Sequence, residues 1–240
     1  MTSVTGIACA TVSSVRTIGV LGGITWHSAA EYYRLLNSLV AERTDGEHAA
    51  RCVLVSVDIG EIDPLMHAGR WEDAAELVAR DARAVEAAGA DVFVLACNSL
   101  HHVWEPIVSG LSIPTIHIAD AAAGELDGRT RVALLGTPWT MELPFFRARL
   151  ASRGFDVVVP GDADRAQLGR SVFDELSHGI VRDETRAYYV DLIERLGVDA
   201  VVLACTEMTL LSLQDAVDVP LVDTARAHAR AAVDYALNSV

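Results

Sequence analysis

An internal repeat constrains the fold of this chain more than any other feature of its sequence. Thr17-Ile-Gly-Val-Leu-Gly-Gly reappears as Arg131-Val-Ala-Leu-Leu-Gly-Thr. Asp91-Val-Phe-Val-Leu-Ala-Cys-Asn-Ser reappears as Asp199-Ala-Val-Val-Leu-Ala-Cys-Thr-Glu, and Ile113-Pro-Thr-Ile reappears as Val219-Pro-Leu-Val. Three matches in one order and at similar spacings predict that the chain consists of two copies of one architecture.

Apolar runs of strand length alternate with helical patterns along the chain, which is typical of parallel sheets connected by crossover helices. The strands predicted from these runs are Thr17–Leu21, Arg51–Val57, Val92–Ala96, Thr115–Ile118, Arg131–Leu135, Asp156–Val159, Ala200–Ala204 and Pro220–Val222. The clearest predicted helices are Ser28–Arg43, Trp71–Ala88, Glu142–Arg153 and Glu184–Leu196. Together with the repeat, this order predicts an α/β protein of two pseudosymmetric lobes. Each lobe would be a mainly parallel sheet flanked by helices, with the active site in the cleft between the lobes.

We expect the two lobes to divide the chain as follows. The N-terminal lobe, with Cys97, would take 17–118 plus 222–240, and the C-terminal lobe, with Cys205, would take 119–221. Residues 1–16 are rich in Ser, Thr, Val and Ala, but they lack a positively charged start and a long apolar block. We therefore interpret them as a flexible extension and not as a signal peptide, which favours a cytoplasmic protein.

Charge and composition exclude several classes of function. The 240 residues carry 33 acidic side chains against 19 basic ones, a net charge of −14, and every basic residue is arginine. Without lysine the chain can form neither the Schiff base of a pyridoxal phosphate enzyme nor a Walker-type phosphate loop. The acidity argues against nucleic acid as a partner. No apolar stretch approaches the roughly 18–20 residues of a membrane helix, and an apolar content of 51% favours a folded globular protein.

Two of the four cysteines, Cys97 and Cys205, occupy equivalent positions in the repeat, each directly after a predicted buried strand. Because ligands of open α/β sheets collect at the carboxyl ends of strands, we expect the two thiols to approach one ligand from opposite sides. Such a pair can move a proton from one face of a carbon centre to the other, with a thiolate as base and a thiol as acid. A single cysteine at a strand end is more often a core residue, but the matched pair favours catalysis. Cys9 and Cys52 have no such partner, and we assign them to the extension and to the core.

A carbanion or enolate formed between two thiols needs hydrogen-bond donors around the substrate carboxylate. Backbone N–H groups and the hydroxyls of Ser99, Thr137 and Thr206 are the candidates. Glu207 is placed either to orient a substrate ammonium or to favour a helix N-terminus. His101, four residues after the first thiol, is open to a role beside the thiolate or in packing. The histidines elsewhere in the chain show no metal-ligand spacing, so we predict no metal site.

Three segments resemble the signature segments of the aspartate/glutamate racemase superfamily. They are Ile18-Gly-Val-Leu-Gly-Gly-Ile-Thr-Trp, Cys97-Asn-Ser-Leu-His and Ala204-Cys-Thr-Glu-Met. The run from Gly136 to Met141 fits the same family, and the likeness extends from Thr17 to the C-terminus. It is a likeness to the branch that contains aspartate racemases and a broad-specificity amino-acid racemase.

This resemblance implies a racemase that needs no cofactor, inverts the α-carbon of a free amino acid, and forms a homodimer. It implies that Cys97 and Cys205 are the two acid/base residues. It also implies a set of residues that line the site for the substrate α-carboxylate and amino group: Thr25, Asn98, Ser99, Thr137 and Thr206.

The substrate is harder to infer, because related racemases carry a lysine where this chain has Gln167. In the relatives that lysine holds the side-chain carboxylate of aspartate or glutamate, and a neutral amide does not supply its charge. Arg165 and Arg170 are nearby in sequence, but helical spacing does not guarantee that either replaces it. We keep Gln167 as a substrate-binding residue and expect aspartate, glutamate or a polar neutral amino acid as substrate.

The sequence leaves two other functions open. One is a decarboxylase or cis–trans isomerase of a small dicarboxylate, in which the same cleft performs different chemistry. The other is a non-catalytic protein that binds an amino acid. The presence of both cysteines favours the racemase over the decarboxylase.

Overall fold

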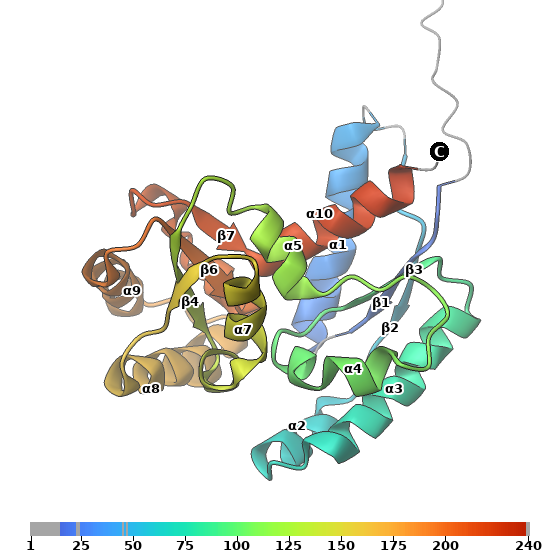
Figure 1. Ribbon diagram of the computed structural model, residues 1–240, viewed down its shortest axis with the longest axis horizontal. Coiled ribbons are helices and arrows are strands. Elements are labelled where there is room, and N and C mark those ends of the chain that lie inside the picture. The colour runs from blue at the N-terminus through green and yellow to red at the C-terminus, as the bar shows by residue number, and fades with distance from the viewer. Residues whose placement is uncertain (1–14, 23–24, 45, 47, 239–240) are drawn as a thin grey trace, which may run out of the picture.

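The computed structural model of the protein describes residues 15–22, 25–44, 46 and 48–238. Its ribbon consists of two lobes, each built around a sheet, which lie side by side (Figure 1). Most of the predicted extension over 1–16 lies outside the described residues, as do Cys9 and Gly23.

The strands form two parallel sheets. The first sheet, in the order β2-β1-β3, contains β1 (Ile18–Leu21), β2 (Cys52–Val55) and β3 (Val92–Leu95). The second, in the order β5-β4-β6-β7, contains β4 (Arg131–Gly136), β5 (Asp156–Val158), β6 (Ala200–Ala204) and β7 (Leu221–Asp223). The predicted two-lobed α/β architecture is confirmed, and the first three strands of each lobe follow the same order.

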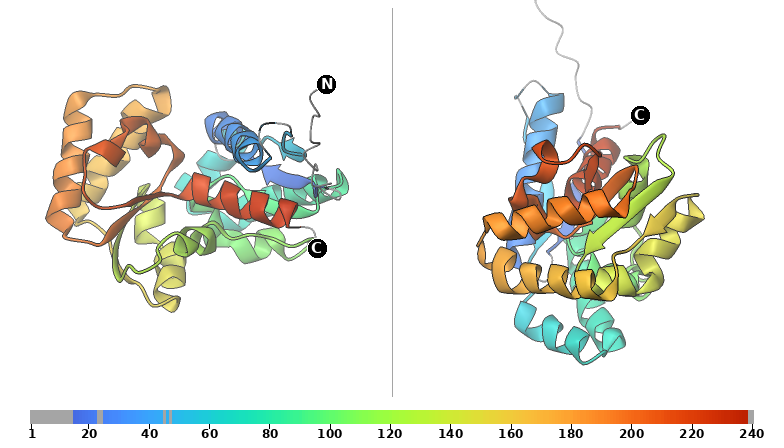
Figure 2. Two further views of the ribbon diagram at one scale, coloured as in Figure 1. Left: turned by 90° about the horizontal axis from the view of Figure 1, so that it is seen from above. Right: turned by 90° about the vertical axis from the view of Figure 1, so that its left-hand side faces the viewer.

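Helices cover both faces of each sheet (Figures 1 and 2). In chain order they are α1 (Trp26–Arg43), α2 (Ile59–His67), α3 (Trp71–Ala87), α4 (Trp104–Val108), α5 (Ile118–Gly124), α6 (Pro138–Glu142), α7 (Pro144–Ser152), α8 (Asp162–Arg170), α9 (Asp183–Leu196) and α10 (Thr224–Leu237). A short 3₁₀ helix follows each predicted catalytic cysteine, over Ser99–Val103 and Thr206–Leu211. None of the helices in the described ranges combines the length and the apolarity that crossing a membrane requires.

The central strands are buried on both faces because their alternate residues enter different cores. In β3, Val92 and Val94 pack with α1 and α10, whereas Phe93 and Leu95 pack with α3 on the opposite face. The residues of β6 divide in the same way between two cores of the second lobe. Burial on both faces explains why the sequence reads as continuous apolar runs at these strands.

The repeat is visible in the hydrogen bonds that anchor the two lobes. The Asp91 carboxylate accepts a hydrogen bond of 2.7 Å from the Thr17 backbone N–H at the start of the first sheet. The Asp199 carboxylate accepts one of 2.9 Å from the Arg131 N–H at the start of the second. Each aspartate precedes the strand that carries a cysteine at its end, so both strands begin from matching anchors.

Three predicted elements differ from the structure. The strand predicted over Thr115–Ile118 is reduced to a single bridge between Phe93 and Thr115, and α5 begins at Ile118. The strand predicted over Arg51–Val57 ends at Val55. The helix predicted over Glu142–Arg153 begins only at Pro144, because the proline holds Leu143 in an extended conformation, and Glu142 is the last residue of the separate helix α6.

Helix α10 links the lobes. It runs from the second sheet along the first lobe, as the red helix of Figure 2 shows. Ala225 and Ala229 of α10 lie in a core of the first lobe, and Ala227 lies in a core of the second. The division of the chain into 17–118 plus 222–240 and 119–221 stays a prediction.

Gly19 of β1 provides a test of this packing. A Cβ atom at this position would overlap Val85 Cγ1 and lie 2.6 Å from the Ala90 Cβ, so neither neighbour leaves room for it. We expect Gly19→Ala to lower the free energy of unfolding by about 1–3 kcal/mol, measured by urea denaturation. Gly124→Ala is the matched control, since no atom lies within 4 Å of the added methyl group. Equal stability of the two variants would contradict the packing described.

Candidate active site

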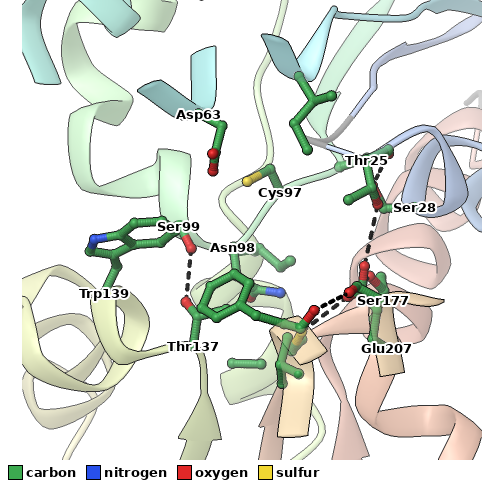
Figure 3. Close-up of a pocket in the computed structure, with 18 of the residues that line it drawn as sticks. Thr25, Ser28, Asp63, Cys97, Asn98, Ser99, Thr137, Trp139, Ser177 and Glu207 are labelled. Atoms are coloured by element: carbon green, nitrogen blue, oxygen red, sulfur yellow. Dashed lines mark hydrogen bonds between the residues drawn. The ribbon is translucent and has the colours of Figure 1, made fainter. Parts of the chain in front are cut away.

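The two cysteines of the repeat line a single cavity of about 230 Å³. Cys205 directly follows β6, and Cys97 follows β3 after one further residue. Because the sheets are parallel, both side chains emerge at carboxyl ends of strands, where α/β proteins bind ligands. Figure 3 shows the cavity, with Cys97 opposite residues of the second lobe. The structure therefore brings the two thiols together at one site between the lobes.

Most of the substrate-binding residues predicted from the sequence line this same cavity. They are Thr25, Asn98, Ser99, Thr137, Thr206 and Glu207. Gln167 is not among the lining residues: it lies on α8, where its Oε1 accepts a hydrogen bond of 2.6 Å from Arg170. The structure gives no cation from this helix to the cavity.

Cys205 is a buried thiol beside a carboxylate. Its side chain is 7% exposed, and its Sγ donates a hydrogen bond of 3.0 Å to Glu207 Oε2. Burial raises the pKa of the Cys205 thiol well above its usual value, and the Glu207 charge and the hydrogen bond raise this pKa further. Cys205 is therefore protonated at neutral pH and is able to act as an acid.

Glu207 also joins the two lobes. Its Oε2 accepts a second hydrogen bond of 2.7 Å from the Thr206 hydroxyl. Its Oε1 accepts one of 3.3 Å from the hydroxyl of Thr25, the residue that precedes α1 in the other lobe (Figure 3). The alternative reading of Glu207 as a residue that favours a helix N-terminus does not account for these contacts. The carboxylate is held in the cavity by three side chains.

A second polar bridge crosses the cleft on the Cys97 side. The hydroxyl of Ser99 lies 3.1 Å from the Thr137 hydroxyl (Figure 3). It also lies 3.4 Å from the Thr140 hydroxyl. Thr137 and Thr140 are themselves 3.2 Å apart and belong to the turn that follows β4. The hydroxyls of Ser99 and Thr137, which line the cavity, can donate hydrogen bonds to an anion there, and Thr140 supports them from the buried side. Thr140 is not apparent from the sequence, because its contact depends on the turn of α6.

A third polar connection starts at Asn98, next to Cys97, and leads through α10 to β6 of the second lobe. Its amide donates a hydrogen bond of 3.2 Å to Thr224 of α10, and the Thr224 hydroxyl donates one of 3.0 Å to the Leu203 carbonyl of β6. The Asn98 Oδ1 atom is buried and has no hydrogen-bond partner among the described residues. A buried acceptor of this kind is normally satisfied, so a donor that reached it would form a hydrogen bond that the described residues do not provide.

Three buried, neutral histidines lie next to the loop that carries Cys97. The His101 Nδ1–H donates a hydrogen bond of 2.7 Å to the Cys97 carbonyl, and its Nε2 accepts one of 3.3 Å from the Ile118 N–H. Burial and the neighbouring His117 and His228 lower the pKa of His101 well below its usual value. His101 therefore stays neutral and positions the cysteine through the backbone, which decides between its two predicted roles in favour of packing.

Several lining residues were not predicted from the sequence. They are Ser28, Tyr32, Ile59, Asp63, His67, Val172, Phe173 and Ser177. Asp63 and His67 are four residues apart on α2, a spacing that places two side chains on one helix face and that could have revealed them. The described part of the chain has no group of three or more His, Cys, Asp or Glu side chains placed to hold a metal ion.

Comparison with known proteins agrees with this geometry. The family model for Asp/Glu/Hydantoin racemase matches residues 21–232, which include both cysteines and every lining residue of the cavity. This chain belongs to the Asp/Glu/Hydantoin racemase family.

Individual relatives support the assignment. A candidate Asp/Glu racemase from Yersinia pestis is 39% identical, with a TM-score of 0.87 over 93% of this chain and 100% of its own. An aspartate racemase homologue from Pyrococcus horikoshii OT3 is 31% identical, with a TM-score of 0.82 over 92% and 99%. The broad specificity amino-acid racemase RacX of Bacillus subtilis is 25% identical over 62% of this chain and 66% of its own length, just under two thirds.

The Cys205–Glu207 contact of this racemase-family protein leads to a direct test. Glu207→Gln removes the charge that raises the pKa of the Cys205 thiol, so the inflection in the pH dependence of its alkylation should move to lower pH. The rate is measured with iodoacetamide, by mass spectrometry of the peptide that contains Cys205. Because burial persists, the inflection should stay above that of a free thiol. Glu76→Gln, on the exposed surface of α3, serves as control, and an unchanged inflection in Glu207→Gln would contradict the proposed coupling.

Proposed function

We propose that this chain racemises a free amino acid without a cofactor, with Cys97 and Cys205 as acid and base on opposite faces of the α-carbon. The observation that carries the proposal is that both cysteine side chains line one cavity from matching strand ends of the two lobes. A base on one side and an acid on the other are what inversion of a carbon centre requires. The proposal includes the cytoplasmic location and the homodimer expected from the sequence.

In one direction the Cys97 thiolate removes the α-proton and becomes a thiol. The electron pair of the broken C–H bond moves into the substrate carboxylate, and Cys205 delivers its proton to the opposite face of the carbon. Cys205 is suited to this step because its raised pKa keeps it protonated before the reaction. The step leaves a Cys97 thiol and a Cys205 thiolate, which is the starting state for the opposite direction.

Between turnovers, the Cys97 thiol loses its proton to water and the Cys205 thiolate takes one from water, which restores the starting state. The Glu207 carboxylate favours this state, because it accepts the hydrogen bond of the protonated Cys205 thiol at 3.0 Å. Thr206 and Thr25 hold the carboxylate in place while this occurs. In this account Glu207 is a positioning residue, which affects proton transfer through its contact with the Cys205 thiol.

The remaining polar groups are suited to hold the substrate. The hydroxyls of Ser99 and Thr137 provide donors for the α-carboxylate, whose negative charge increases as the proton leaves. The buried Oδ1 of Asn98 provides an acceptor for the α-ammonium group. With both ends fixed, the α-carbon would lie between the two sulfur atoms, which holds the reacting atoms in the orientation that proton transfer needs.

The test is the activity of variants in which one sulfur is replaced by oxygen. We expect Cys97→Ser and Cys205→Ser each to lower the rate of racemisation by at least about 100-fold, because an alcohol is a far weaker acid than a thiol and is not ionised to its basic form near neutral pH. Chiral chromatography of the L-amino acids incubated with purified protein measures this rate. Circular dichroism and urea denaturation establish that the variants fold.

Cys52→Ser is the matched control, since Cys52 lies on β2 away from the cavity and its replacement should leave the rate unchanged. Full turnover by either Cys97→Ser or Cys205→Ser would overturn the two-thiol mechanism. Release of CO₂ in place of racemisation would identify a decarboxylase. Binding of an amino acid without turnover would identify a binding protein.

A further inference from the structure

The cavity continues past the two thiols toward α2. Ile59, Asp63 and His67 of α2 line this part together with Trp139 and Phe173 of the second lobe. Figure 3 shows the Asp63 carboxylate and the Cys97 sulfur directed into the same space, with Glu207 on the far side. This part of the cavity is where the side chain of a substrate would extend from the reacting carbon. We call the five residues the α2 subsite.

Among the described residues, the lining contains two carboxylates but neither arginine nor lysine. Two carboxylates, Asp63 and Glu207, line the cavity, whereas no arginine of the described residues does, and the whole sequence contains no lysine. A substrate with an acidic side chain would therefore place a third carboxylate in a small cavity that has no guanidinium or ammonium group to hold it. The charge disfavours aspartate and glutamate and favours a substrate that brings its own positive charge.

The two carboxylates differ in how far their hydrogen-bonding capacity is used. Glu207 accepts hydrogen bonds from Cys205, Thr206 and Thr25. Asp63 has one polar side-chain partner among the described residues, the His67 ring at 3.5 Å, which forms an ion pair only when it is protonated. The Asp63 side chain is 35% exposed. Its oxygens thus remain open to a donor that enters the cavity.

Aromatic rings line the same part of the cavity. The His67 ring meets the Trp139 ring edge-on with centroids 4.8 Å apart, and the Trp139 and Phe173 rings are 5.8 Å apart in a similar arrangement. These contacts connect α2 of one lobe with the second lobe. Ring faces attract cations and also cover the methylene groups of a long side chain. The α2 subsite combines an open carboxylate with aromatic walls.

From these observations we propose that the substrate is an amino acid with a cationic side chain, whose terminal ammonium or guanidinium group binds Asp63. The inference rests on the proposed racemase function and gives its substrate class. The α-ammonium is assigned to Asn98 and the α-carboxylate to Ser99 and Thr137, so Asp63 is left for the second cation. Trp139 and Phe173 would pack against the aliphatic part of the side chain.

The experiment compares L-lysine with L-norleucine, which has the same chain but no terminal ammonium group. We expect the wild-type protein to racemise lysine with at least a tenfold higher kcat/KM than norleucine, and aspartate and glutamate more slowly than either. Asp63→Asn should reduce the lysine-to-norleucine ratio at least tenfold, because its amide is uncharged. Glu61→Gln removes a charge from the exposed face of α2 outside the cavity and should leave the ratio unchanged.

The possible outcomes are distinguishable. If Asp63→Asn lowers kcat/KM for lysine and norleucine equally, Asp63 binds the α-ammonium group and the inference is wrong. A wild-type preference for norleucine, aspartate or glutamate over lysine also overturns it, while the racemase function stands. If none of the amino acids is racemised by the wild-type protein, the proposed function fails and the inference fails with it.

Discussion

The site depends on one constraint, which is that two parallel sheets must direct the ends of equivalent strands toward the same space. A parallel strand buried on both faces leaves its carboxyl end as the place where polar side chains can meet a ligand. In this chain β3 and β6 are such strands, and each delivers a cysteine. Duplication therefore creates a pair of chemically matched groups that no single lobe could provide.

Hydrogen bonds between polar side chains connect the two lobes across the cleft. Thr25 reaches Glu207, Ser99 reaches Thr137, and Asn98 reaches Thr224 on the helix that links the lobes. Each bridge places a side chain within two residues of a cysteine or in contact with one. Several groups that would bind the substrate are thus also groups that connect the two lobes, so the separation of the lobes and the positions of the thiols depend on the same hydrogen bonds.

The sequence was sufficient to predict the α/β fold and the presence of Cys97 and Cys205 at one cavity. Both predictions follow from a repeat whose local patterns are preserved in each copy. It was not sufficient for features that depend on tertiary contacts. The strand expected at Thr115–Ile118 contributes one bridge, although its counterpart β7 is a full strand. Asp63 enters the cavity from α2, a helix that was not predicted. Gln167 was expected at the site from a resemblance, but it lies on α8 outside the cavity lining.

The most direct test of the central claim is isotope incorporation during turnover in D₂O, starting from one enantiomer of an amino acid that the protein racemises. If separate thiols act on the two faces, the product formed early in the reaction carries deuterium at the α-carbon, while the remaining substrate keeps its protium. If one group acts on both faces, deuterium appears in substrate and product together, or the original proton is carried into the product. That second pattern would contradict the assignment of Cys97 and Cys205 to opposite faces of one stereocentre.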